Sequence, residues 1–577
     1  MNSSTSGAAW WREAIVYQVY VRSFADANGD GVGDLDGIRS RLDHIASLGV
    51  DAIWLNPCYP SPQRDHGYDV ADYAGIHDEY GDLAAFDALL AAARRRGIRI
   101  LMDLVPNHCS DQHPMFTEAL AASPGDDTRD RFWFRDGRPS GDDPHGAPPN
   151  NWMAAFGGSA WTRAGEQDPQ WYLGTFSPHQ PDLDHRHPEV MAMFRDAMHF
   201  WFDRGVEGFR VDAIVPVGKH PDLPDQPPVP EGTGMLQIAW ENPYNNFRPE
   251  GHDIWKKFRS FVDEYEASHP GRRLVLCAEA YLNGQPDMVR RYVNDQQFHT
   301  AFAFDLLLSP WVKTSIEQAL RDSFDILEAG STPTFALNNH DVQRIVTRLS
   351  HESATTAEGG AVHLLESWGD IGTGTVDAGL RRARAMIAFV LALPGSTYLY
   401  AGEELGLPEV FDIPADRRED PVFVRTDGQR LGRDGCRTPL PWDDDPATSF
   451  GFSDLAAAAE RAPEPWLPQP SWWGSISMTE QDGDERSTLE LYRHAVAARR
   501  EFVVSQPMAS QVVELGDGLV AVARGDLVAV MNVTSQPIAL DLEHPLLAIT
   551  QPVFASEPAE MHTPGVIPPD STIWFMS

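Results

Sequence analysis

The chain has 577 residues, of which 42% are hydrophobic and 23% are charged, and its formal net charge is −38. This composition is that of a globular protein with ample apolar residues for one large domain and smaller satellites. The negative charge argues against nucleic acid or an anionic membrane as a partner, because it would repel phosphate groups. It fits a neutral or cationic ligand, although the need for solubility would also account for it.

Residues 1–9 are polar and lack the basic start and the apolar run of a secretion signal. No apolar stretch approaches the roughly 20 residues that a bilayer-spanning helix needs. The cysteines have no CxxC spacing, which is typical of free thiols in a reducing compartment. They are Cys58, Cys109, Cys277 and Cys436. We therefore expect a cytoplasmic protein, either a monomer or a small homo-oligomer.

Short apolar segments alternate with amphipathic helical stretches along most of the chain. The expected strands are Ile15–Tyr20, Ala52–Leu55, Ile98–Val105, Gly208–Ile214, Leu274–Ala278, Ala301–Leu306, Thr334–Leu337 and Thr397–Ala401. The expected helices include Leu35–Leu48, Leu83–Arg96, Glu189–Arg204, Asp253–Ala267 and Ala378–Leu393. About eight strand–helix units predict an α/β fold in which a parallel sheet closes into a (β/α)8 TIM barrel.

Three regions depart from this alternation. Residues 108–180 are rich in Pro, Gly, Asp and Trp and are expected to form an inserted subdomain or lid. The proline-rich run at 221–230 is expected to form a rigid wall over the barrel mouth. From about Val504, short alternating segments separated by turns predict an antiparallel β domain; they are Gln511–Leu515, Leu519–Arg524, Leu527–Asn532 and Ile538–Leu542. The predicted division is a barrel at 1–107 and 181–503, an inserted subdomain B at 108–180 and a C-terminal β-sandwich at 504–577.

Acidic side chains stand where the expected barrel strands end. Arg210 and Asp212 share one face of a strand because side chains alternate along it, so the guanidinium is expected to hold Asp212 ionised. Glu279 and Asp341 end two other strands. Since reactive groups of a TIM barrel lie at the carboxyl ends of its strands, we expect the three acids to meet at one mouth.

Two opposed carboxyl groups suit the cleavage of a glycosidic bond with retention of configuration, for which they stand roughly 5–5.5 Å apart. Asp212 would act as the nucleophile. Glu279 faces two anionic aspartates, which should raise its pKa and let it donate a proton. His108 and His340, cationic or neutral, could donate hydrogen bonds to sugar hydroxyls. Alternatively, each acid alone could cap a helix or bind a neighbouring loop.

These segments resemble the signature regions of the α-amylase family, glycoside hydrolase family 13. The matching segments are Asp103–His108, Gly208–Ala213, Glu279 and Asn339–Asp341, with Gly49–Pro57 as a further one. Gln180–Asp184 resembles a fifth region in the α-glucosidase and oligo-1,6-glucosidase branch. The resemblance implies Asp212 as nucleophile, Glu279 as general acid and base, and Asp341 as stabiliser of the transition state. It also implies that His108, Arg210 and His340 contact the sugar.

The same resemblance implies an exo-acting enzyme with a closed pocket. Asp65 and Arg433 would pair at the pocket floor and bind the terminal 4-hydroxyl group, and Tyr68 would stack under the sugar ring. Phe156 and Phe176 match aromatic positions that line this pocket in the branch, although ordinary lid packing would also explain them.

Two positions bear on the substrate. Ala213 follows the nucleophile, where relatives that cut α-1,6 bonds tend to carry valine, so we expect a preference for α-1,4 links or small substrates. Asp184 stands where the branch often has asparagine, which leaves acceptor choice open.

A loop after the first strand carries oxygen donors at the spacing of the first part of an EF-hand. The donors are Asp26, Asn28, Asp30, Asp34 and the backbone carbonyl of Val32. Gly37 stands where an EF-hand has its bidentate glutamate, so this is not an EF-hand. The resembling glucosidases place Ca²⁺ or Mg²⁺ here, which implies a structural ion and no organic cofactor. The alternative is an Asx-turn loop without metal.

We expect a retaining α-glucosidase that acts on short α-glucosides such as maltose. An α-glucosyltransferase, a sucrose isomerase or a sucrose-splitting enzyme would share the first half-reaction. A non-catalytic transporter partner would need a membrane anchor and altered acids, and a carbohydrate-binding module would not need opposed acids. No glycine-rich phosphate loop, HExxH motif or GxSxG elbow is present.

Overall fold

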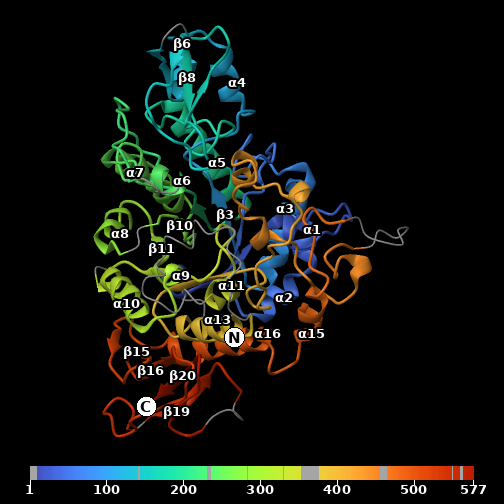
Figure 1. The fold of residues 1–577 in the computed structure, drawn as a ribbon, viewed down its shortest axis with the longest axis vertical. Coiled ribbons are helices and arrows are strands. Elements are labelled where there is room, and N and C mark those ends of the chain that lie inside the picture. Colours follow the sequence, from blue (N-terminus) through green and yellow to red (C-terminus); the bar gives the residue numbers. More distant parts are fainter. Residues whose placement is uncertain are drawn as a thin grey trace.

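The computed structural model describes residues 9–140, 143–230, 235–281, 284–328, 330–351, 376–454, 464–548, 550–558 and 563–577. At its centre eight parallel strands form a closed barrel (Figure 1). In barrel order they are β1 (Ile15–Val19), β2 (Ala52–Leu55), β3 (Arg99–Leu104), β9 (Gly208–Val211), β10 (Val275–Ala278), β11 (Thr300–Ala303), β12 (Pro333–Ala336) and β13 (Ser396–Tyr400), which returns to β1. The predicted TIM barrel is confirmed, and each strand overlaps a predicted one, although the strand predicted at Ala301–Leu306 ends at Ala303 and its last two residues begin helix α9 (Asp305–Leu308).

Helices follow the strands and cover the outside of the barrel. They include α1 (Leu35–Ser40), α2 (Leu42–Ser47), α3 (Leu83–Arg95), α5 (Pro188–Arg204), α6 (Met235–Trp240), α7 (Pro249–Ser268), α8 (Pro286–Tyr292), α9 (Asp305–Leu308), α10 (Lys313–Glu328), α11 (Ile345–Ser350) and α13 (Val376–Val390). Phe86, Leu89, Leu90 and Ala93 recur at helical spacing on α3, and this face is buried. The single helix predicted at 35–48 is divided at Arg41, whose backbone leaves the helical range.

Residues that follow β3 form a small unit at one end of the molecule (Figure 1, top). It contains α4 (Pro114–Ala121), a three-stranded antiparallel sheet of β4 (Phe134–Asp136), β8 (Gln170–Leu173) and β7 (Trp161–Arg163), and the pair β5 (Arg138–Ser140) and β6 (Asp143–Ala147). The proline-rich run lies against this unit: Leu223 packs among its tryptophans, and the Trp152 indole donates to the Pro224 carbonyl at 2.9 Å.

The chain ends in a second antiparallel sheet at the opposite end of the molecule, reached through α15 (Met478–Gln481) and α16 (Thr488–Ala498) (Figure 1). Its strand order is β14 (Gln511–Val513), β15 (Leu519–Arg524), β16 (Leu527–Asn532), β20 (Ser571–Met576) and β18 (Gln551–Ala555), with β17 (Ile538–Ala539) and β19 (Val566–Ile567) paired beside it. Val520 and Trp574 join the main core, whereas Ala521 and Phe575 join a second cluster. Both faces of β15 and β20 are therefore covered.

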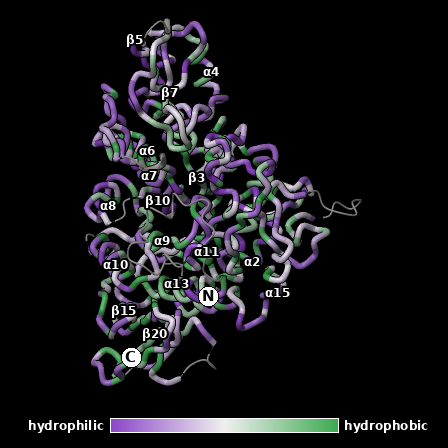
Figure 2. The backbone as a smooth tube through the Cα atoms, in the orientation of Figure 1, coloured by the Kyte–Doolittle hydropathy of each residue, from purple (hydrophilic) through white to green (hydrophobic). Residues whose placement is uncertain are grey.

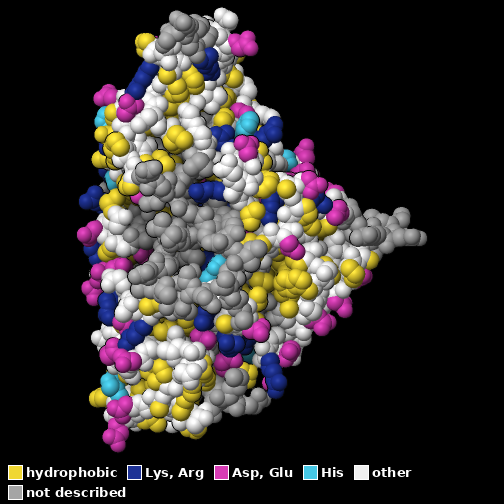
Figure 3. Space-filling view, viewed as in Figure 1, with side chains coloured by type: hydrophobic (Ala, Val, Ile, Leu, Met, Phe, Trp, Pro, Cys, Tyr) yellow, Lys and Arg dark blue, Asp and Glu magenta, His cyan; other side chains and the backbone are white. Residues whose placement is uncertain are grey.

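Hydrophobic and hydrophilic segments alternate along the chain (Figure 2), and acidic side chains are spread over the visible surface (Figure 3). Among the described residues, no helix combines the length and the apolar character that crossing a membrane requires.

Candidate active site

Three acids surround one arginine at the carboxyl ends of β3, β9 and β10. Asp103 and Arg210 are register partners on neighbouring parallel strands, so their side chains leave the sheet at the same level. Arg210 Nη1 donates to Asp212 Oδ1 at 2.5 Å and to Asp103 Oδ1 at 3.0 Å, and Nη2 lies 3.5 Å from Glu279 Oε2. The predicted pair of carboxyl groups, Asp212 and Glu279, thus faces a single guanidinium group.

A backbone group links the two carboxyl positions directly. The Ala213 amide, next to Asp212, donates to Glu279 Oε2 at 2.8 Å. Ala213 has a φ of 45°, in the left-handed region that side chains other than glycine rarely adopt. A β-branched residue such as valine would be more strained at this φ than alanine is.

Burial and charge act on the two acids in the same direction. Burial raises the pKa of Asp212 well above its ordinary value, and the neighbouring Glu279 and Asp103 add to the effect despite Arg210. Burial, with Asp341 nearby, likewise raises the pKa of Glu279. Arg210 lowers the pKa of Asp212, as expected, but burial and the two neighbouring acids outweigh this effect. The contact of Arg210 with Asp212 is shorter than its contact with Glu279, so the guanidinium stabilises the Asp212 carboxylate more strongly. This difference favours placing a shared proton on Glu279.

Asp341 lies in a more cationic environment. Arg433 Nη1 and Arg437 Nη2 reach its Oδ1 atom at 2.9 and 3.0 Å, and His340 Nε2 is 3.3 Å from Oδ2. Burial alone would raise the pKa of Asp341, but His340, when it is protonated, and the two guanidinium groups at every pH outweigh it and hold that pKa well below the ordinary value. Asp341 is therefore ionised throughout the neutral range.

The predicted pairing of Asp65 with Arg433 is present. Arg433 Nη2 donates to Asp65 Oδ1 at 2.8 Å, and the Gln180 amide donates to Asp65 Oδ2 at 3.0 Å. Arg433 comes from the loop after β13 and Gln180 from the residues before α5, so the ion pair joins distant segments beside Asp341.

Tyr68 and both histidines lie beside these acids. The Tyr68 hydroxyl donates to Asp103 Oδ2 at 2.9 Å, and the Tyr68 ring stacks on His340 with centroids 5.3 Å apart. His108 contacts the Tyr68 carbonyl at 3.0 Å. Burial lowers the pKa of His108 to about 4 and that of His340 well below its ordinary value, so both imidazoles are neutral near pH 7. Of the two charge states left open above, the neutral one applies.

The two predicted aromatic residues pack together above this network. The ring centroids of Phe156 and Phe176 are 5.8 Å apart, and Phe176 also contacts His108 at 5.0 Å. The Arg433 guanidinium lies over the Phe156 ring at 5.0 Å. Val422, in α14 (Pro421–Arg425), packs in the same cluster.

The loop between β1 and α1 folds as a series of side-chain-capped turns. Asp26 Oδ1 and Oδ2 accept the amides of Gly29 and Gly31 at 2.6 and 2.8 Å, and Asp30 Oδ1 accepts the Val32 amide at 2.9 Å. Asn28 and Asp34 accept backbone amides in the same way. Within the described ranges, no group of three His, Cys, Asp or Glu side chains is gathered as a metal site. The ion in this loop stays a prediction.

Sequence reasoning missed one carboxylate at the edge of the site. Asp420 is fully buried, and its Oδ2 atom accepts from Arg433 Nε at 2.6 Å. The only local signal is the pair Asp420-Pro421, which is typical of a helix start, and it does not point to Arg433.

The family model for the catalytic domain of α-amylase matches residues 18–506 of the chain. The chain belongs to the α-amylase family. It is 36% identical over 524 residues to a probable α-glucosidase of Rhizobium meliloti, which covers 87% of this chain and 85% of that protein. It is 33% identical over 522 residues to the oligo-1,6-glucosidase of Parageobacillus thermoglucosidasius, covering 85% of this chain and 84% of that protein.

Solved structures of two enzymes resemble nearly the whole chain. An α-glucosyl transfer enzyme has a TM-score of 0.81 with 30% identity, covering 99% of this chain and 100% of the other. The trehalulose synthase of Pseudomonas mesoacidophila MX-45 has a TM-score of 0.78 with 27% identity over the same shares. The resemblance to glycoside hydrolase family 13 and its glucosidase branch is thus confirmed.

Proposed function

We propose that the protein is a retaining, exo-acting α-glucosidase that removes the terminal non-reducing glucosyl residue of short α-glucosides. The single observation that supports this most is the placement of Asp212 and Glu279 on the same Arg210 guanidinium, with Asp341 held ionised nearby. The α-glucosidase named among the relatives is consistent with this activity.

In the first step, Glu279 transfers its proton to the glycosidic oxygen while Asp212 attacks the anomeric carbon. The bond to the leaving group breaks, and a covalent β-glucosyl ester forms on Asp212. The raised pKa of Glu279 favours its protonated form, and Arg210 stabilises the Asp212 carboxylate.

In the second step, the Glu279 carboxylate takes a proton from a water molecule, which attacks the same carbon and releases α-glucose and Asp212. Asp341 is anionic and partly exposed, so it can stabilise the oxocarbenium charge of both transition states. His108 and His340 are neutral and would serve as hydrogen-bond partners of sugar hydroxyls.

The ion pair of Asp65 and Arg433 is proposed to bind the terminal 4-hydroxyl group, with Tyr68, Phe156 and Phe176 around the ring. We keep the expected preference for α-1,4 links, because the small Ala213 side chain leaves more room beside the nucleophile than valine would. The test compares initial rates on maltose and isomaltose, with transfer products counted. A clear preference for isomaltose would refute the linkage assignment, and inactivity on both would refute the hydrolase.

A second candidate is an α-glucosyltransferase or a sucrose isomerase or hydrolase. It is favoured by the resemblance to an α-glucosyl transfer enzyme and to a trehalulose synthase. Both candidates share the glucosyl-enzyme and differ in whether water or a sugar or alcohol accepts the glucosyl group. Product analysis on maltose, sucrose and trehalose distinguishes them.

We also propose a structural Ca²⁺ or Mg²⁺ ion in the loop of Asp26, Asn28, Asp30, Val32 and Asp34. Carboxylate and carbonyl oxygens are suitable ligands, and Asp26 Oδ2 and Asp30 Oδ1 each accept one backbone amide, which leaves a lone pair for an ion. Titration with either ion after chelation should raise the melting temperature, and Asp30→Ala should remove that rise. No rise with either ion would refute the site.

The cellular location is proposed as cytoplasmic. Cys58, Cys109, Cys277 and Cys436 are buried free thiols, which suits a reducing compartment. The proposed partner is a small oligosaccharide, with the protein as a monomer or small homo-oligomer. Mass measurement of the purified protein in solution tests the last point.

A further inference from the structure

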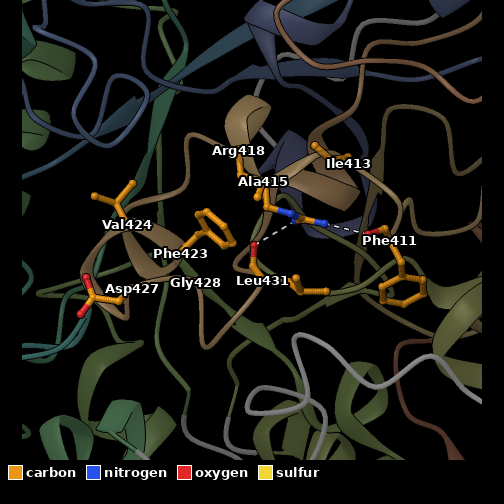
Figure 4. A pocket seen from close by; sticks show the side chains of 9 residues that line it. All are labelled: Phe411, Ile413, Ala415, Arg418, Phe423, Val424, Asp427, Gly428 and Leu431. Carbon is orange, nitrogen blue, oxygen red and sulfur yellow. Dashed lines mark hydrogen bonds between the residues drawn. The ribbon is translucent and has the colours of Figure 1, made fainter.

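The loop between β13 and Arg433 is fixed by its own contacts. Arg418 donates to the Leu431 carbonyl at 3.1 Å and to the Phe411 carbonyl at 2.8 Å (Figure 4). These contacts form one side of a surface pocket of about 640 Å³, in which Phe423 of α14 is a lining residue. Val422, the preceding residue, packs with Phe156. The loop therefore holds α14 between the surface pocket and the aromatic residues of the site.

Asp420 joins this loop to the floor of the active site. One oxygen, Oδ1, accepts the Val422 amide at 2.7 Å and so caps the start of α14. The other, Oδ2, accepts from Arg433 Nε at 2.6 Å. Asp420 has no exposed surface, whereas Asp341 on the same arginine is partly exposed. Asp420 therefore contacts Arg433 from the side away from a bound sugar.

Arg433 makes a different contact with each edge of its guanidinium group. Nε points to Asp420, Nη1 to Asp341 and Nη2 to Asp65, at 2.6, 2.9 and 2.8 Å. A planar fork that is fixed at its Nε edge has little freedom to turn its other two edges. Without Asp420, the ion pairs with Asp65 and Asp341 would remain possible, but the orientation of Arg433 would be set by the ligand-facing acids alone.

We propose that Asp420 is the positioning residue that orients Arg433 for recognition of the terminal sugar hydroxyl. This inference rests on the proposed α-glucosidase function and adds a residue that does not touch the substrate. Asp420 sets selectivity for the end of the sugar chain by two routes: it holds the Arg433 fork, and it caps the helix that packs Val422 against Phe156.

The test uses Asp420→Asn in the full-length enzyme with p-nitrophenyl α-glucoside and its 4-deoxy analogue. Asparagine keeps an oxygen for the Val422 amide, but its NH2 group then faces Arg433 Nε, so that hydrogen bond is lost. A small displacement of a positioning group can cost about 10²-fold in rate. We expect kcat/KM to fall by about that factor for the glucoside and much less for the 4-deoxy analogue.

The ratio of the two substrates separates positioning from a general structural role. Asp420→Ser is the second variant, because serine can cap α14 but is too short to hold Arg433. Asp82→Asn is the matched control: Asp82 caps α3 through the Ala85 amide at 2.8 Å and is exposed, so activity should be unchanged. If a folded Asp420 variant lost kcat/KM by the same factor on both substrates, so that the ratio of the two values were unchanged, the inference would be overturned. A wild-type enzyme inactive on both substrates would instead refute the proposed function.

Discussion

Two clusters of three carboxylates stand side by side in this site and differ in their supply of positive charge. Asp103, Asp212 and Glu279 share Arg210. Asp65, Asp341 and Asp420 share Arg433, and Arg437 adds a second guanidinium group to Asp341. Burial and neighbouring acids raise the pKa values of Asp212 and Glu279, whereas the arginines depress that of Asp341. Contact with two arginines thus distinguishes Asp341 from the acids that contact only one, because burial raises the pKa of Asp65 in the Arg433 cluster as well.

The comparison accounts for a division of labour. A glycosidase needs one mobile proton and one permanent negative charge near the oxocarbenium ion. The Arg210 cluster has too little positive charge to keep three buried carboxylates ionised, so it can retain a proton. In the Arg433 cluster, Asp341 contacts two guanidinium groups and stays anionic.

The largest effect is expected from Asp212→Asn, which removes the nucleophile but keeps the side-chain shape. We expect kcat to fall by at least about 10⁴-fold, the scale seen when a nucleophile is removed. Steady-state kinetics on maltose measures the loss, and circular dichroism checks that the fold is kept. Activity near the wild-type level would show that Asp212 is not the nucleophile.

Glu279→Gln should cause the next largest loss of activity, because it removes the proton donor. We expect a loss of about 10²–10⁴-fold on maltose and a much smaller one in glucosyl-enzyme formation from 2,4-dinitrophenyl α-glucoside, whose leaving group needs no proton. The descending high-pH limb of kcat/KM should disappear with the titrating acid. Equal losses for the two leaving groups in the pre-steady-state burst would contradict the role of Glu279.

Much of this site could be predicted from the sequence because strand ends place polar residues at one barrel mouth. Asp212, Glu279 and Asp341 were found in this way, and family resemblance supplied the pair of Asp65 and Arg433. The pKa of Asp212 could not be predicted, because only the fold shows that Arg210 is shared by three acids. The same applies to Asp420, which lies in an irregular loop without periodicity.

Part of the fold was not predicted from the sequence. Strands β18 and β20 of the C-terminal sheet were not predicted, although the four segments before them were. The residues of β20, Ser571–Met576, are almost all buried, because one face packs on the main core and the other on a separate cluster. The predicted strand β15 is covered on both faces as well, and the unpredicted β18 is exposed or half-buried, so burial on both faces does not explain why β18 and β20 were missed.

Arg437→Gln should weaken the Arg433 cluster, because it removes one of the two guanidinium groups that contact Asp341. Breaking a buried ion pair on one side typically costs about 3–5 kcal/mol. Because the pKa of Asp341 is depressed in the folded state, its stabilising contribution is present above the unfolded pKa and is lost as pH falls. Denaturation at several pH values should therefore show a larger destabilisation at pH 6 than at pH 3. A pH-independent loss would mean that Arg437 acts through packing only.

The smallest effect, on stability and not on activity, is expected from substituting Glu403, a buried acid outside both clusters. Glu403 accepts from the Tyr492 hydroxyl at 2.7 Å, and burial raises its pKa to about 7. A folded pKa above the unfolded value gives stability that is present at low pH and is lost as pH rises from about 4.5 through 7. The glutamine side chain of the Glu403→Gln variant cannot ionise. The free energy of unfolding of the variant minus that of the wild type should therefore rise by at most about 3 kcal/mol from pH 5 to pH 8. A difference that stays constant with pH would show that folding leaves the pKa of Glu403 unchanged, and that burial is not sufficient to hold a proton at this position.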